Sequence, residues 1–119
     1  MTRRLAALLV AAALLAACAK PIPAGHRDLV GTWDGPGMQL EITADGRLAY
    51  HRQKGSGNVS IEAPIQEIGA GRFTAGLGPM TTEFRIDRAP RLENGAWTMT
   101  VDGVALVRRD GGAPLPVER

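Results

Sequence analysis

Apolar and polar residues alternate with a period of two along most of the chain after residue 29, which is the spacing of half-buried β-strands. The clearest case is Met38, Leu40 and Ile42, whose neighbours in the sequence are polar. Turns rich in glycine separate these short runs, and no run has the longer period of a helix. The pattern predicts an all-β domain of about seven to eight strands, a small antiparallel meander that closes into a barrel or a sandwich.

The first well-defined hairpin surrounds Ala44-Asp45-Gly46. Matching the apolar positions on its two sides pairs Ile42 with Leu48 and Leu40 with Tyr50. This register leaves a three-residue loop that ends in glycine, the residue that most easily takes the left-handed conformation such a loop needs. The register of this hairpin is therefore a specific prediction.

The last hairpin turns at Asp102-Gly103, a dipeptide typical of two-residue turns between strands. Its register places Trp97 opposite Arg108, so Arg108 shares the inward parity of the apolar residues beside it. The same register predicts the pairs Val101–Val104 and Met99–Leu106.

The intervening segments are assigned by the same rules. The polar residues 52–58 and the residues 89–95 are expected to form loops. Pro64 lacks an N–H, and parity is lost just after it, which predicts a β-bulge near Gln66-Glu67. The side chains expected to face the interior are Trp33, Met38, Leu40, Ile42, Leu48, Tyr50, Phe73, Ala75, Leu77, Thr82, Phe84, Ile86, Trp97 and Met99.

The N-terminal residues have the three parts of an export signal. Arg3 and Arg4 precede an apolar run from Leu5 to Ala17. This run is shorter than the roughly 20 residues that span a bilayer, and it ends in small residues, as at a signal cleavage site. We therefore expect residues 1–17 to be a signal peptide.

The stretch Leu15-Ala16-Ala17-Cys18 resembles the lipobox of bacterial lipoproteins. The resemblance implies that Cys18 receives a diacylglyceryl group, that the chain is cut before it, and that the new amine is acylated. Ala19 in place of aspartate implies the outer membrane, at its periplasmic face. The alternative is an ordinary signal peptide with an incidental cysteine.

These boundaries divide the chain into four parts. Residues 1–17 are the signal peptide and residues 18–28, which carry Pro21 and Pro23, are the lipidated tether. Residues 29–110 are the β-domain and residues 111–119 are expected to be a frayed tail.

Charge and cysteine content exclude several classes of function. Arg3 and Arg4 account for the whole formal charge of +2, so the rest of the chain is neutral. A basic face for nucleic acid is not indicated. Cys18 is the only cysteine, which leaves none for a disulfide within the domain. The core alone must stabilise a fold of this size.

Leu29-Val30-Gly31-Thr32-Trp33 resembles the Gly-x-Trp opening of lipocalins and related calycin barrels. In those families an arginine or lysine of the last strand packs across this tryptophan at the closed end of the barrel. The resemblance implies a structural cation–π cluster of Trp33, Trp97 and Arg108. The whole chain also resembles a group of small, uncharacterised bacterial lipoproteins with a GTW start and a VDG hairpin, and this likeness implies no activity.

Neither histidine indicates catalysis or metal binding. His26 lies in the tether, and His51 has outward parity, opposite Gln39, with no second histidine near enough to complete a set of three or four ligands. Ser56 and Ser60 lack the context of an activated nucleophile. We therefore predict no catalytic residues, no metal and no cofactor, and hence no enzyme.

Three classes of function remain, in decreasing order of preference. The first is a non-catalytic interaction or structural module that is held to the membrane through acylated Cys18 and contacts an envelope protein or wall component. The second is a lipocalin-like carrier of a small apolar ligand, which the bulky inward side chains oppose because they are expected to fill a barrel this small. The third, an enzyme, is the least favoured, because the sequence shows no convergent set of polar residues.

Overall fold

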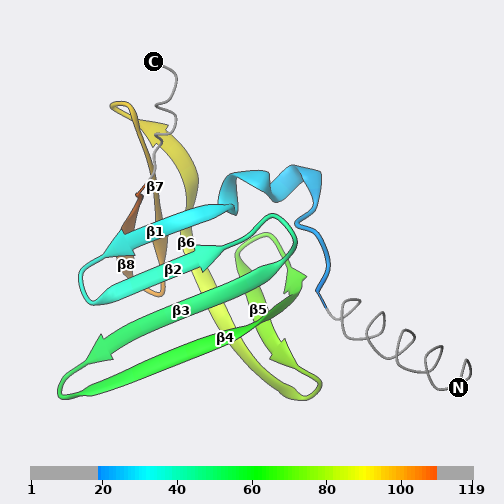
Figure 1. Cartoon of the computed structure of the whole chain (residues 1–119). Helices are drawn as coiled ribbons and strands as arrows, with labels where there is room; N and C mark the ends of the chain where they lie inside the picture. The colour runs from blue at the N-terminus through cyan, green and yellow to red at the C-terminus, as the bar shows by residue number, and fades with distance from the viewer. Residues whose placement is uncertain (1–18, 110–119) are drawn as a thin grey trace, which may run out of the picture.

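Eight antiparallel strands follow one another around a closed barrel, and a short 3₁₀-helix, η1, lies at one of its ends (Figure 1). The computed structural model describes residues 19–109 of the chain. The sequence prediction of an all-β meander is confirmed, and its closure is that of a barrel. The elements are η1 (Ala24–Leu29), β1 (Gly31–Gly35), β2 (Met38–Ile42), β3 (Arg47–Lys54), β4 (Gly57–Ile68), β5 (Arg72–Leu77), β6 (Met80–Glu93), β7 (Ala96–Val101) and β8 (Val104–Arg108).

The predicted register of the β2–β3 hairpin is confirmed. Ile42 pairs with Leu48 and Leu40 pairs with Tyr50. Gly46 has φ +94°, and a Cβ at this position would overlap the carbonyl oxygen of Lys20, so both the backbone and the space require glycine.

The predicted register of the β7–β8 hairpin is also confirmed. Val101 pairs with Val104 and Met99 with Leu106. Asp102 and Gly103 have φ of +48° and +79°, which is the conformation of the two-residue turn expected from this dipeptide.

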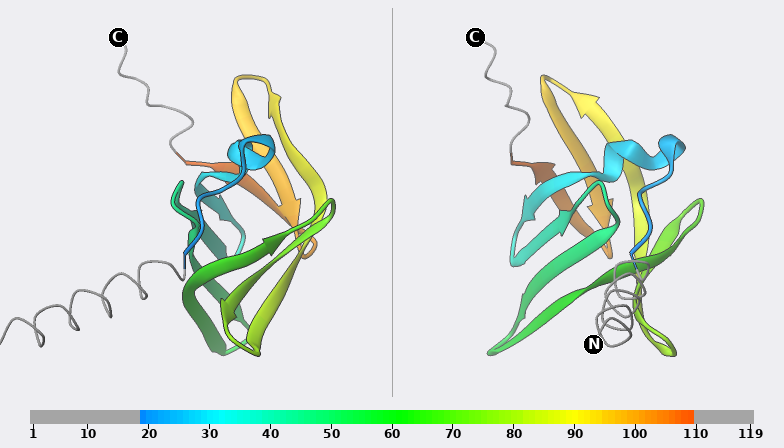
Figure 2. Two further views of the ribbon diagram at one scale, coloured as in Figure 1. Left: turned by 90° about the vertical axis from the view of Figure 1, so that its right-hand side faces the viewer. Right: turned by 45° about the vertical axis from the view of Figure 1, so that its right-hand side comes forward.

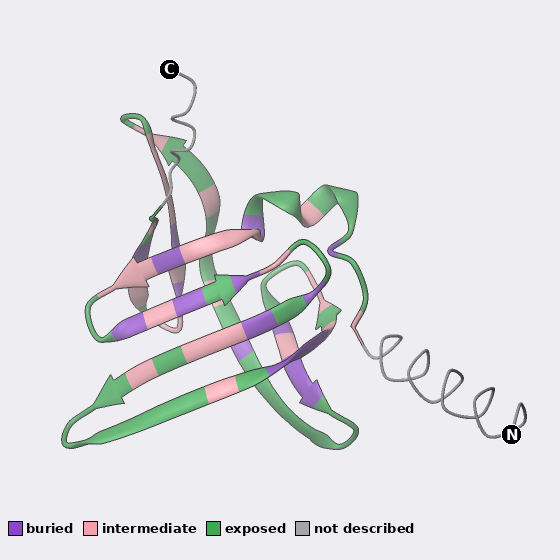
Figure 3. Ribbon diagram, in the orientation of Figure 1, coloured by how far each residue is buried: buried purple, intermediate pink, exposed green. Residues whose placement is uncertain are grey.

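The predicted loop at 52–58 is wrong. β3 continues to Lys54 and β4 begins at Gly57, so the two strands are joined by a turn of Gly55 and Ser56 alone. The residues of this extension are polar because they lie beyond the core and most are exposed (Figure 3). A strand with no buried face does not need apolar residues at every second position. Its sequence therefore lacks the alternation by which a strand is recognised.

The predicted loop at 89–95 is wrong as well. β6 runs through it to Glu93, and the turn is confined to Asn94 and Gly95. The register of β6 against β7 shifts between Ile86 and Arg88 and again between Arg88 and Arg91. Each shift moves the side chains that follow to the other face of the sheet. The alternation of apolar and polar residues is therefore interrupted, and the sequence pattern does not reveal the strand.

The inward positions predicted for Leu77 and Thr82 are wrong. Both residues are exposed, Leu77 by 60%. Ala75 is the last residue of β5 that pairs with β4; Leu77 lies beyond it, and Thr82 is the partner of Ala75 on β6, on the side away from β4. Without a strand opposite, inward parity does not produce burial.

The predicted bulge in β4 is confirmed, because the register against β5 shifts between Ile65 and Glu67. Pro64, just before it, is buried and pairs with Arg47 of β3. The bulge therefore falls at the point where the β3 ladder of β4 ends and its β5 ladder begins.

The segment expected to be a tether is partly built into the domain. Ile22 and Leu29 are buried, by 97% and 98%, and the Ile22 N–H donates to the Ala44 carbonyl at 3.0 Å. Between them, η1 lies across the end of the barrel (Figure 2). Strand-based patterns could not place Ile22, because a single apolar residue between two prolines has no periodicity.

The core fills the inside of the barrel. Most of the predicted inward residues are buried, while Tyr50, Ile86 and Trp97 are partly buried and pack against them. Phe84 stacks on Phe73 at 5.0 Å between ring centroids and makes a T-shaped contact with Tyr50 at 4.9 Å. The buried core consists of Ile22, Leu29, Trp33, Met38, Leu40, Ile42, Leu48, Ala63, Ile65, Phe73, Ala75, Phe84, Met99, Val101 and Leu106.

Candidate functional site

The structure brings together Trp33, Trp97 and Arg108, the three residues that the final hairpin and the Gly-x-Trp opening place side by side. Trp33 of β1 pairs directly with Arg108 of β8, where the barrel closes. The Arg108 guanidinium carbon lies 5.8 Å from the ring centroid of Trp33 and 5.1 Å from that of Trp97. A cation within about 6 Å of an indole contributes about 0.5–2 kcal/mol, so this cluster stabilises the seam of the barrel.

The glycine of the Gly-x-Trp opening has a steric role in this cluster. Gly31 has φ +141°, and a Cβ there would lie 2.5 Å from Cδ of Arg108. The missing side chain leaves the space through which the aliphatic stem of Arg108 passes. The position is therefore restricted to glycine by both the backbone and its neighbour.

The indole of Trp33 is also held through its nitrogen. Its Nε1–H donates to the carbonyl oxygen of Leu29, at the end of η1, over 2.9 Å. Arg108 Nη1 donates to the Val30 carbonyl at 3.4 Å. These bonds join η1 to the seam between β1 and β8, so the N-terminal segment and the last strand stabilise each other.

A second arginine stabilises the same seam from outside. Arg109 donates through Nε and Nη2 to the two carboxylate oxygens of Asp34, at 2.8 and 2.9 Å, and through its backbone N–H to Thr32 at 2.6 Å. The side chain of Arg109 is 57% exposed, so water screens this pair strongly. The two adjacent arginines thus face opposite sides of the barrel wall.

On the outer face, the structure reveals a pair that the sequence argument did not identify. His51 lies opposite Ser60, and its Nδ1 is 2.9 Å from Ser60 Oγ. Gln39, Glu41 and Glu62 surround this pair in an open depression of about 300 Å³. The register of the β3–β4 hairpin, which follows from its two-residue turn, was the signal that could have predicted it.

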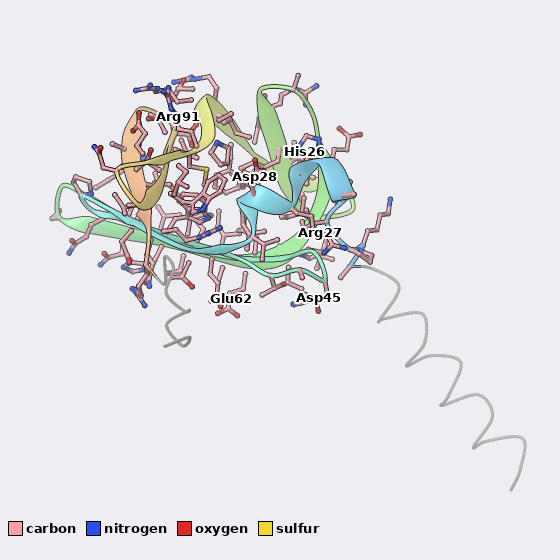
Figure 4. The ribbon with its side chains drawn as sticks, turned by 90° about the horizontal axis from the view of Figure 1, so that it is seen from above. His26, Arg27, Asp28, Asp45, Glu62 and Arg91 are labelled. Carbon is pink, nitrogen blue, oxygen red and sulfur yellow. The ribbon has the colours of Figure 1, made fainter. Side chains whose placement is uncertain are left out.

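Within this outer depression, His51 has a side-chain hydrogen bond to Ser60 alone among the described residues. A base needs a third group to orient its ring, and neither Glu41 nor Glu62 bonds to His51. Within residues 19–109, no group of three or more histidine, cysteine or acidic side chains is placed to hold a metal ion. Figure 4 shows Glu62 pointing away from the barrel, into solvent.

The other residues singled out in the sequence are dispersed. His26 is on η1, next to Arg27 and Asp28 (Figure 4), and borders a depression of about 220 Å³ between η1 and β6. Ser56 is exposed in the β3–β4 turn. Cys18, the expected lipidation site, lies outside the described residues.

The turn between β7 and β8 is fastened to β6 by two carboxylates. Asp87 accepts from Arg85 Nε at 2.6 Å and from the Gly103 N–H at 2.7 Å, while Asp102 accepts from the Arg85 N–H at 2.9 Å. The hydrogen bond from Arg85, followed by the one from Gly103, holds the pKa of Asp87 below its ordinary value. This cluster fixes the turn, and its hydrogen bonds are exposed to solvent.

No protein-family model, no curated protein and no solved structure matches this chain. In residues 19–109, no helix is both long and apolar enough to cross a membrane.

Proposed function

We propose that this protein is a lipid-anchored lipoprotein of the cell envelope, whose barrel is a non-catalytic interaction or structural module. We prefer a module to a ligand carrier because side chains fill the interior of the barrel. Trp33, Leu40 and Phe73, from three separate strands, are completely buried by protein. An apolar ligand would have to displace side chains that are already packed, at a cost of several kcal/mol.

The anchor is proposed from the stretch Leu15-Ala16-Ala17-Cys18. Acyl chains on Cys18 would hold the chain to the membrane, because each buried methylene contributes about 0.8 kcal/mol and two chains make the attachment stable. Ala19 in the next position supports the periplasmic face of the outer membrane as the location. Because Ile22 is fixed to the barrel, only residues 19–21 would separate the acylated cysteine from the folded domain.

A lipocalin-like carrier is the second candidate, because an eight-stranded barrel with tryptophan and arginine at its seam fits that architecture. Lipocalin-type carriers enclose a cavity, and drug-sized pockets have about 300–1,000 Å³. The depression of about 300 Å³ found here is on the outer face, lined by Gln39 and His51. The packed rings of Phe73 and Phe84 occupy the place where such a ligand would bind.

The anchor is tested in the full chain by metabolic labelling with a fatty acid and by cell fractionation. The expected result is label in the wild type, in the membrane fraction, and loss of both in Cys18→Ser. The matched control is Ser56→Ala, which should keep both. An unlabelled, soluble wild-type protein would contradict the anchor.

The choice between module and carrier is tested by titrating the purified protein with fatty acids, retinoid-like probes and a haem analogue. Trp33 and Trp97 are the only tryptophans and both contact the core, so their emission reports on an occupied interior. A flat titration is expected for a filled barrel. Saturable one-to-one quenching would favour the carrier.

A further inference from the structure

One edge of β4 lacks a neighbouring strand over most of its length. β3 pairs with β4 from Gly57 to Pro64. On the other side, β5 pairs with β4 only from Ile65 onward. In the described part of the chain, the segment 57–64 is therefore a strand with one free edge, although the barrel as a whole is closed.

The ladder between β4 and β5 stops for identifiable reasons. Pro64 has no N–H to donate, and the bulge begins just after it. The side chain of Gln66 then takes the place of a backbone partner, because its Nε2 donates to the Gly76 carbonyl at 3.0 Å. Beyond this point the β3–β4 and β5–β6 hairpins diverge, and their tips lie well apart in Figure 1 and in the right-hand view of Figure 2.

The register identifies which backbone groups face the free edge. Ile65 donates its N–H to Gly46 at 2.8 Å, and hydrogen bonding to a given neighbour alternates along an antiparallel strand. The odd-numbered residues of β4 therefore bond to β3. The N–H and C=O groups of Asn58, Ser60 and Glu62 point the other way, and no backbone group within residues 19–109 bonds to them.

The side chains along this edge alternate in a way that fits the same edge of a second copy of the chain. Val59, which is 43% exposed, and Ile61 lie on the face that continues the barrel interior. Asn58, Ser60 and Glu62 lie on the outer face. We propose that two copies of the chain pair antiparallel through this edge, with Ser60 of each copy on a two-fold axis.

This pairing brings compatible side chains together on both faces of the joined strands. Centring the pair on Ser60 sets Val59 against Ile61 of the second copy, and Asn58 against its Glu62, so apolar residues meet apolar ones and no like charges are opposed. Centring it on Glu62 would place two carboxylates face to face. Exchange of backbone hydrogen bonds along an exposed edge is the usual mode of such pairing.

The proposal is tested on residues 19–119, which contain every residue of the described core. Cys18 is the only cysteine of the sequence, so Ser60→Cys introduces the sole thiol. Directly opposed residues lie about 5.5 Å apart between Cα atoms, within the roughly 4.4–6.8 Å that a disulfide spans. Mild oxidation should give a disulfide-linked dimer, whereas Ala105→Cys, exposed on β8, should stay largely monomeric.

Sedimentation equilibrium supplies the second measurement. The wild type should show a monomer–dimer equilibrium, and Val59→Asp should weaken it at least about tenfold by placing a charge against Ile61. Ser56→Asp, in the turn of the same hairpin, should leave it unchanged, and circular dichroism should show both variants folded. Three results would each overturn the proposal. The wild type could be a monomer at every concentration, or the two cysteine variants could cross-link equally. The third is a dimer whose dissociation constant Val59→Asp leaves unchanged.

Discussion

The stem of Arg108 crosses the α-carbon of Gly31 so closely that a Cβ there would lie 2.5 Å from Arg108 Cδ. The short motif that opens β1 is thus explained by a residue at the far end of the domain. Glycine leaves room for the stem, and the tryptophan that follows two residues later receives the guanidinium. The contact joins the first and last strands, which makes it a sensitive probe of barrel closure.

Gly31→Ala should therefore destabilise the domain by about 1–3 kcal/mol, from backbone strain at φ +141° and from displacement of Arg108. Urea unfolding followed by tryptophan emission measures the change. Gly25→Ala is the matched control, because nothing lies within 4 Å of a Cβ at that position. It should change the free energy of unfolding by no more than about 0.5 kcal/mol.

The steric part of this cost is separable from the strain. In an Arg108→Ala background the stem is gone, so the additional cost of Gly31→Ala should fall by at least about 0.5 kcal/mol, the lower limit usual for residues in contact. Strictly additive effects of the two substitutions would show that the clash with Arg108 is not what restricts position 31.

Arg108 and Arg109 are expected to differ although they are adjacent. Arg108→Ala removes a stem and a cation packed on two indoles, and should cost about 1–3 kcal/mol. Arg109→Ala removes an exposed pair with Asp34 and should cost at most about 1 kcal/mol, less at high salt. Equilibrium unfolding at two salt concentrations compares them. A larger cost at Arg109 would mean that the seam depends mainly on its outer ion pair.

The parts of this fold that the sequence predicts are those where one face of a strand is buried. The Leu40–Tyr50 and Met99–Leu106 pairs follow from alternation and turn chemistry alone. The arrangement of Trp33 beside Arg108 follows from the same register once the barrel is taken to close. Local pattern and tertiary structure agree at these positions.

Prediction fails where a strand has no buried face or changes face. The tip of the β3–β4 hairpin is polar on both sides, and the two shifts in β6 reverse its parity between Ile86 and Arg91. The His51–Ser60 contact was missed for the first of these reasons, because the polar residues 52–58 between them were assigned to a loop, which left the pairing of β3 with β4 undetermined. Register beyond the core depends on turn geometry rather than on hydrophobicity.

Asp87 should make stability sensitive to acid. Its pKa is lowered in the folded state by Arg85 and by the Gly103 N–H, so it stabilises the fold fully above the ordinary value of 3.8. That contribution decreases as the pH falls through 3.8 towards the lower pKa of the folded state. Urea unfolding at a series of pH values should show Asp87→Asn less stable than wild type at neutral pH, with the difference shrinking in acid. A constant difference at every pH would contradict the assignment.

The burial of Ile22 predicts that the N-terminal segment is a structural part of the domain. Its side chain is 97% buried beside the β2–β3 loop, and its N–H bonds to Ala44. Ile22→Ala should therefore cost about 2–4 kcal/mol, through lost apolar burial and the cavity left behind. Leu92→Ala is the matched control, because Leu92 is 60% exposed and should contribute less than about 1 kcal/mol.

Hydrogen exchange gives the same prediction a local readout. In the wild type the Val30 and Ile22 amides should be protected, since each donates to a backbone carbonyl. Ile22→Ala should release the backbone amide of residue 22 first and then those of η1, whose last residue, Leu29, accepts the indole hydrogen bond of Trp33. Exchange that spreads from η1 to the seam between β1 and β8 would show that this segment holds the barrel closed. Exchange confined to residues 20–23 would show that this segment binds to the barrel but does not hold it closed.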